Sequence, residues 1–190
     1  MGDDARWLQG LQADRAAKDQ WFKHGHDSPI PHALRHQFTA LAYYPPNPAL
    51  HLRLRLQPNS NTEVVEMMAS SGPPRRYLKW GTFEFEVEGQ RVRLWAYRLE
   101  RPQGEDYLFV PFRDATSGKE TYGAGRYIDL HYRADGEYDL DFNQAYSPHC
   151  AYSPDYSCPL PPVENWLKVP IRAGEKEFPL KEYVEEAFHA

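Results

Sequence analysis

Apolar and polar residues alternate along most of the chain after residue 37, as in strands with one buried face. Strand-like runs are predicted at 37–44, 48–57, 62–69, 76–87, 91–100, 106–113, 125–133 and 138–145. Turn-forming residues separate many of these runs, for example Pro45-Pro46-Asn47 and Glu88-Gly89-Gln90. No helical pattern lies between them, which favours antiparallel pairing over a parallel sheet. The pattern predicts a mainly β fold, an antiparallel meander that closes into a barrel-like or sandwich domain and so removes exposed edges.

Two segments show a helical period instead. The first runs from Asp4 to His24, and its apolar side consists of Trp7, Leu8, Leu11, Trp21 and Phe22. Asp14 and Lys18 interrupt that side, so we expect the helix to bury its two ends against the domain, with a partner-binding helix as the alternative. The second is a short packing helix from Leu180 to Phe188. We therefore expect an N-terminal helix and linker over 1–36, one β domain over 37–178 and a C-terminal helix over 179–190.

The alternation also predicts how two pairs of strands meet. The apolar faces of 76–87 and 91–100 face the same side if a two-residue turn, Glu88-Gly89 or Gly89-Gln90, joins them. The apolar faces of 125–133 and 138–145 meet only across an odd loop, such as three residues containing Gly136 with a bulge. The opposite face of this second hairpin is polar. It is either a solvated sheet face or one wall of a cavity.

Two long connections border the second hairpin, from Arg113 to Gly123 and from about Tyr146 to Asn165. Loops of this length are usually functional or disordered, and the tyrosines and prolines of the second favour packing. We expect both to cover one pocket that binds a small polar or anionic ligand, with Arg126 as a bidentate donor. The candidate binding residues are Asp114, Thr116, Ser117, Tyr122, Arg126, Asp141, Asn143, Tyr146, Glu164 and Asn165. For Asp114, Thr116 and Ser117, which precede Gly118, the alternative is a structural role in an Asx or Ser/Thr turn.

Cys150 and Cys158 lie eight positions apart in the second connection. They are expected either to form a bridge or to pack as inert thiols. We expect no cofactor, and a zinc ion held by His149, Cys150, Cys158 and one carboxylate is a weaker alternative because this spacing matches no established zinc module. A cysteine nucleophile paired with His149 or His131 is a further alternative. The same region therefore also allows a hydrolase-like enzyme, with Asp141 or Asp114 as base.

Composition narrows the class of protein. Of 190 residues, 41% are hydrophobic and 14% aromatic, which is enough for a packed core and excludes overall disorder. No stretch approaches the ~18 consecutive apolar residues of a membrane-spanning helix, and the acidic start lacks the apolar segment of a signal peptide. We expect a cytoplasmic protein without a membrane partner. The net charge of −5 argues against a nucleic-acid partner, which needs a basic surface.

Several segments resemble a known family. The strings FVPFRDATSGKETYGAGRY, DLDFNQAYSPHCAYS and CPLPPVENWLKVPIRAGEK are similar to the signature of a bacterial and archaeal family classed as a domain of unknown function. The earlier strings DSPIPHALRHQFTALAYY and KWGTFEFEVEG fit its looser N-terminal pattern, so the resemblance covers roughly residues 5–178. It implies no activity, cofactor or catalytic residue.

Overall fold

The computed structural model describes residues 2–101 and 107–189. The α-helices of the described residues are α1 (Asp3–His24) and α2 (Lys181–His189). The strands of these residues are β1 (His51–Arg55), β2 (Gln57–Pro58), β3 (Val64–Met67), β4 (Arg75–Val87), β5 (Gln90–Leu99), β6 (Tyr107–Phe112), β7 (Arg126–His131) and β8 (Glu137–Asp141). All the ladders between these strands are antiparallel. The mainly β antiparallel fold with a helix near each end is therefore confirmed.

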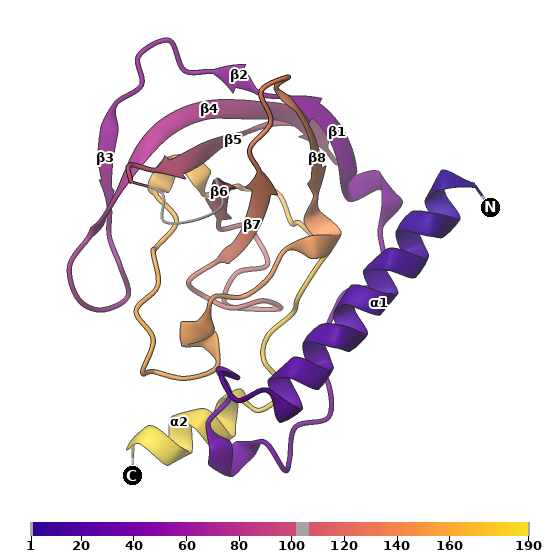
Figure 1. The fold of residues 1–190 in the computed structure, drawn as a ribbon, viewed down its shortest axis with the longest axis vertical. Coiled ribbons are helices and arrows are strands. Elements are labelled where there is room, and N and C mark those ends of the chain that lie inside the picture. The colour runs from indigo at the N-terminus through magenta and orange to yellow at the C-terminus, as the bar shows by residue number, and fades with distance from the viewer. Residues whose placement is uncertain (1, 102–106, 190) are drawn as a thin grey trace.

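The strands form two sheets. The larger has the order β2-β4-β5-β6-β7, with β3 also paired to β4, and the smaller contains β1 and β8. In Figure 1, β4 and β5 arch over the molecule and the β1–β8 pair stands at one side. There β1 lies next to β4 and β8 next to β7. Within residues 2–101 and 107–189 no ladder joins the two sheets, so closure into a barrel or sandwich stays a prediction.

The run predicted at 37–44 is not a strand. Tyr43 makes only an isolated bridge with Glu175, and the backbone N–H of Leu41 donates to the Asp19 side chain of α1 at 2.8 Å. Phe38 and Leu41 are buried, so the apolar residues that looked like a strand face serve as packing positions of an irregular segment. Of the run predicted at 106–113, position 106 lies outside the described residues.

The β4–β5 hairpin forms as predicted. Val87 pairs with Gln90, which leaves the two-residue turn Glu88-Gly89. Both turn residues have positive φ, 49° at Glu88 and 75° at Gly89, as a type I′ turn requires. Phe83 pairs with Leu94 on the buried face, so the even loop brings the two apolar faces together.

The hairpin predicted between 125–133 and 138–145 is wrong. β8 pairs with β1, and β7 pairs with β6. On the other edge of β7, Tyr127 exchanges backbone hydrogen bonds with Tyr146, at 2.8 and 3.0 Å. The chain beyond β8 thus occupies the edge that β8 was expected to take, and the continuous polar face predicted across this hairpin does not form.

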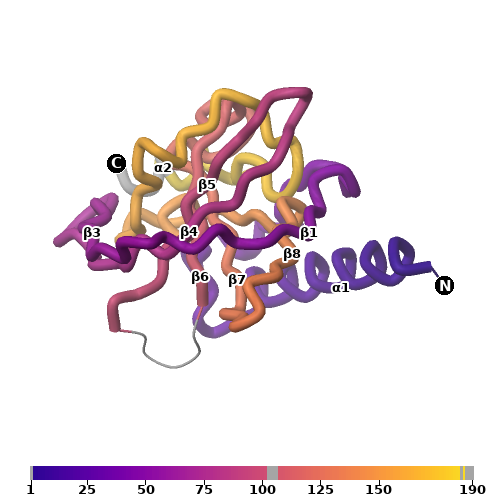
Figure 2. Tube along the Cα trace, turned by 90° about the horizontal axis from the view of Figure 1, so that it is seen from above, coloured from indigo at the N-terminus to yellow at the C-terminus, as the bar shows by residue number. Residues whose placement is uncertain are grey.

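The described residues form a main core between the sheets, a second cluster below them, and a small third cluster of Met67, Tyr77 and Tyr97. Phe83, Leu94, Leu108, Val110 and Leu140 are fully buried in the main core. The second cluster lies beneath the C-terminal end of α1 and gathers buried apolar residues from distant parts of the chain: Phe22, Phe38, Tyr152 and Phe178. Figure 2 shows α1 running along one side of the β strands, with its N-terminal turns projecting outward.

Helix α1 is attached mainly by polar contacts. Leu11 and Phe22 are its buried residues, and Trp7 is partly buried against the His51 ring, so both halves of the helix contact the domain although Leu8 is 37% exposed. Near its N-terminus the Trp7 indole donates to Asp141 at 2.7 Å. Further along, Lys18 binds the buried carboxylate of Glu175. Within the described ranges, neither this helix nor α2 has the length and apolarity to cross a bilayer.

Two glycine substitutions test the close packing around the C-terminal segment. Gly174 has φ +76°, and a Cβ there would lie 2.5 Å from the carbonyl oxygen of Ala145. Gly174→Ala is therefore expected to lower the free energy of unfolding by about 1–3 kcal/mol in urea denaturation. Gly10→Ala, in an open position on α1, is the control and should raise stability by up to about 1 kcal/mol. Equal stability of Gly174→Ala and the wild type would contradict the packing described.

Candidate functional site

Arg126, the predicted ligand donor, is buried and binds the chain itself. It begins β7 and is 1% exposed. Its guanidinium donates to the carbonyl oxygens of Ile171, Ala173 and Glu175 at 2.7, 2.5 and 3.0 Å. Burial lowers the pKa of Arg126, and the carboxylate of Asp114, 3.6 Å away, opposes that shift. The geometry is that of a cation that fixes a backbone segment.

The predicted turn residues complete this cluster. Asp114 accepts hydrogen bonds from the Thr116 hydroxyl at 2.9 Å and from the Ser117 hydroxyl at 3.2 Å. Its second oxygen also accepts the backbone N–H of Ile171 at 2.6 Å. Asp114 and Thr116 are both buried. The Ser117 N–H donates to the Asp114 carbonyl at 3.0 Å, and the Ser117 hydroxyl accepts the Asp114 N–H at 3.1 Å, so this segment is a hydrogen-bonded turn that the serine side chain closes. Ligand binding by these residues stays a prediction, and a ligand would have to displace the segment at 171–175.

Asp141, Asn143 and Tyr146 lie where α1 meets the strands. Asp141 accepts the Trp7 indole, and its other oxygen accepts the backbone and side-chain amides of Asn143 at 2.9 and 2.8 Å. The Tyr146 hydroxyl donates to Asp129. Asn143 and Tyr146 line a small cavity of about 190 Å³ beneath α1. The candidate base Asp141 is thus held by the helix that covers it.

Asn165 and Glu164 act on another part of the sheet. The fully buried Asn165 side chain bonds the N–H and C=O of Trp95 at 2.8 Å each, and it donates to Pro111 at 2.7 Å. Glu164 accepts the Tyr97 hydroxyl and pairs with Lys79. The predicted residues therefore fall into separate hydrogen-bonded clusters.

Tyr122 and the two cysteines form a further cluster. The Tyr122 hydroxyl lies 3.6 Å from Cys150 Sγ, and the backbone N–H of Cys150 donates to Cys158 Sγ at 3.3 Å. Both cysteines are free thiols. The His149 ring packs against Trp21 and Tyr156. In the part of the chain that the structure describes, no three His, Cys, Asp or Glu side chains converge on a metal position, so the zinc alternative finds no ligand set there.

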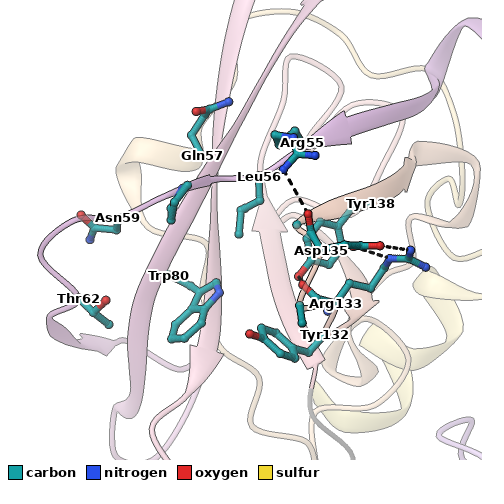
Figure 3. Close-up of a pocket in the computed structure, with 13 residues that line it drawn as sticks. Arg55, Leu56, Gln57, Asn59, Thr62, Trp80, Tyr132, Arg133, Asp135 and Tyr138 are labelled. Atoms are coloured by element: carbon teal, nitrogen blue, oxygen red, sulfur yellow. Dashed lines mark hydrogen bonds and ion pairs between the residues drawn. The ribbon is translucent and has the colours of Figure 1, made fainter.

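A larger hollow, of about 450 Å³, lies between the β1–β2 corner and the turn after β7. We call it the Trp80 pocket; its lining includes the aromatic side chains Trp80, Tyr132 and Tyr138, the apolar Leu56 and Pro58, and the polar Arg55, Gln57, Asn59, Thr62, Arg133 and Asp135. Figure 3 shows Trp80 and Tyr132 next to each other at one end of the pocket, with Asn59 and Thr62 to one side. The Leu56 N–H donates to the Gly136 carbonyl at 2.9 Å and joins the two walls.

A β-bulge aims Trp80 into this pocket. The register between β4 and β5 shifts between Lys79 and Gly81, so Trp80 is the extra residue. A bulge places two successive side chains toward one side of the sheet, and bulges are common beside binding sites. Gly81 allows β2 to approach, because a Cβ there would lie 2.5 Å from the Gln57 carbonyl oxygen.

Trp80 and Tyr132 form an aromatic surface whose rings are held in a fixed orientation. Their ring centroids are 6.1 Å apart in an edge-to-face arrangement. The Arg98 guanidinium lies 4.7 Å from the Trp80 ring and 4.9 Å from the Tyr132 ring. Cation–π contacts of this kind hold the planes of both rings. Tyr132 remains 39% exposed, so part of its side chain is open to a ligand.

The charged groups at the rim are paired. Arg133 binds Asp135 through two nitrogens, and Arg55 pairs with Glu137 at 2.7 Å. The Arg133 hydrogen bonds lower the pKa of Asp135 to about 2, so this carboxylate is charged at neutral pH. The rim therefore has balanced charges.

The sequence prediction missed the Trp80 pocket. Its residues come from strands and turns that looked like ordinary sheet positions. The available signal was Trp80-Gly81 within a long strand run, because a glycine inside a strand pattern often indicates a bulge or a close backbone approach.

Removal of the buried Arg126 side chain should destabilise the folded protein. Arg126→Ala leaves Asp114 and the carbonyls of 171–175 without their cation, and we expect a loss of about 3–5 kcal/mol in the free energy of unfolding. Arg172→Ala is the matched control, because Arg172 pairs with Glu120 at the surface, where solvent screens an ion pair and its removal should leave stability almost unchanged. Urea denaturation measures both. If Arg126→Ala were as stable as Arg172→Ala, Arg126 would not be the structural cation described.

Comparisons with known proteins agree with this β fold. A solution NMR structure of the uncharacterized protein from gene locus rrnAC0354 of Haloarcula marismortui is similar, with a TM-score of 0.70 and 40% sequence identity. The similarity covers 92% of this chain and 96% of that chain. Curated proteins give no match. The family model described as "Protein of unknown function (DUF1684)" matches residues 36–176, and the chain therefore belongs to that family.

Proposed function

We propose that this chain binds a small polar molecule and that the ligand lies in the Trp80 pocket. The observation that carries the proposal is the pair of neighbouring rings, Trp80 and Tyr132, at a hollow of about 450 Å³. Small-molecule sites typically have volumes of about 300–1,000 Å³, with apolar or aromatic walls and a few polar groups. In this proposal the two sheets form the walls of a barrel-like domain, and the pocket lies at one open end of it.

The ligand we propose has a ring with a flat face and several hydrogen-bonding groups, as a sugar or a nucleoside has. A flat face can stack on the open part of Tyr132 or on Trp80. The exposed side chains of Gln57 and Thr62 lie at the rim, where they can bond hydroxyl or amide groups of the ligand. Because Arg55 and Arg133 already pair with carboxylates, a neutral polar ligand fits better than a strongly anionic one.

The same proposal places the protein in the cytoplasm with a small molecule as its partner. Its support is the composition: the net charge of −5 disfavours nucleic acid, and two cysteines do not make a disulfide framework.

Binding can be tested with a panel of monosaccharides and nucleosides in thermal-shift and heteronuclear NMR titrations. A true ligand present at 100 times Kd should stabilise the protein by about 2.7 kcal/mol. It should also shift the indole signal of Trp80. Tyr132→Ala is expected to weaken its binding about tenfold, because the ligand loses one stacking face.

Tyr183→Ala is the matched control, since Tyr183 is an exposed tyrosine of α2, 48% accessible and outside the pocket lining. It should leave Kd unchanged. The proposal fails if Tyr132→Ala binds the ligand as tightly as the wild type does. It also fails if no member of the panel binds at millimolar concentration.

A further inference from the structure

Cys150 and Cys158 lie outside the Trp80 pocket lining, in the long connection after β8. Cys150 is in the short 3₁₀ helix His149–Ala151, and Cys158 directly precedes Pro159. The chain between them folds back, so that the Cys150 backbone N–H donates to Cys158 Sγ at 3.3 Å. The two thiol side chains are therefore neighbours in space.

The partners of Cys150 are hydrogen-bond donors. The Tyr122 hydroxyl approaches its sulfur at 3.6 Å, and the Cys158 thiol lies beside it, within reach of the Cys150 backbone N–H. Donors of this kind stabilise a thiolate over a thiol. The Cys158 hydrogen bond is the largest cause that lowers the pKa of Cys150 to about 6, and the same contact raises the pKa of Cys158. These shifts make Cys150 the more acidic of the two thiols.

The two cysteines differ in access. Cys150 is partly exposed, whereas Cys158 is 7% exposed. Cys158 is also held firmly, because its N–H and C=O bond Ser70 at 3.0 and 2.8 Å and the next residue, Pro159, bridges Ala69. A reagent from solution can therefore reach Cys150 first, while Cys158 stays beside it.

We propose that Cys150 and Cys158 form a reactive dithiol site that reduces low-molecular-weight disulfides by thiol–disulfide exchange. The Cys150 thiolate attacks one sulfur of the substrate disulfide, forms a mixed disulfide and releases the first thiolate. Cys158 then attacks Cys150 Sγ, which closes the Cys150–Cys158 disulfide and releases the second sulfur group, which takes the Cys158 proton. Two electrons pass from the protein to the substrate, and one S–S bond is exchanged for another.

The site does not depend on the proposed ligand of the Trp80 pocket. Its alternative is a pair of inert thiols that only pack the loop. Exchange chemistry distinguishes the two, because an inert pair reacts only after unfolding.

The test uses the reduced full chain and 5,5′-dithiobis(2-nitrobenzoate) as the substrate disulfide. The wild type should release both nitrothiobenzoate groups, keep none bound and lose two hydrogen atoms by intact mass. Cys158→Ser should release one group and retain the other on Cys150, because the resolving thiol is missing. Cys150→Ser should react only slowly, and circular dichroism establishes that both variants are folded.

The pH dependence gives a second, independent measurement. In Cys158→Ser, where a hydroxyl replaces the thiol beside Cys150, alkylation by iodoacetamide should rise with pH and level off above a midpoint near 6. At pH 6.5 this rate should exceed that of free cysteine about sixfold, because the larger thiolate fraction outweighs the lower intrinsic nucleophilicity. Cys158→Ala removes the donor, so its midpoint should move toward about 8.5.

Two results would overturn the proposal. One is a native wild-type protein whose thiols resist both reagents until denaturant is added. The other is a wild type that keeps a bound nitrothiobenzoate group without forming the intramolecular disulfide. Neither result changes ligand binding at Trp80, so the two proposals can fail separately.

Discussion

The buried guanidinium of Arg126 is the interaction on which the rest of the structure depends. It holds three carbonyl oxygens of the segment 171–175, with Asp114 at its side. That segment carries Glu175, which is 2% exposed and binds Lys18 of α1, the Tyr152 hydroxyl and the backbone of Ser147. One fixed segment therefore attaches both the N-terminal helix and the connection that carries the thiols. A buried cation with several partners suits this role because its directional hydrogen bonds define one arrangement of the chain.

Local pattern explains the parts of the fold that form between neighbours in sequence. The β4–β5 hairpin could be predicted because alternation set the faces and the turn Glu88-Gly89 has the required two residues. The partners of β7 and β8 could not be predicted in this way, because they depend on which segment of the chain pairs with the free edge of each strand. Tyr146 takes the edge of β7, and β1 takes β8. Likewise, 37–44 has a strand-like sequence, but its apolar residues pack beneath α1.

The same distinction applies to the candidate site. The sequence from Asp114 to Arg126 combines a carboxylate, hydroxyls, glycine and arginine, which are groups that can bind a small polar ligand, and the arginine can also bind an anion. These groups serve equally well to bind backbone carbonyls and N–H groups, and the sequence holds no information on which partner is present. The prediction did identify the residues with unusual polar contacts. It could not show that residues 171–175, about fifty positions away, occupy them.

The Trp80 pocket and the thiol pair have different structural origins. The pocket arises where regular pairing is interrupted, since the bulge at Trp80 and the contact between Gly81 and Gln57 open one corner of the large sheet. The thiol pair arises where an irregular loop is fixed, since Ser70 and the bridge from Ala69 to Pro159 hold Cys158 next to Cys150. Ser70 follows β3, which pairs with β4, and β4 carries Trp80. Arg75, the first residue of β4, also donates to the Ser157 carbonyl, next to Cys158, at 2.6 Å. The thiol pair therefore lies near the start of β4 and the Trp80 pocket further along it, so a substitution can disturb one site and leave the other in place.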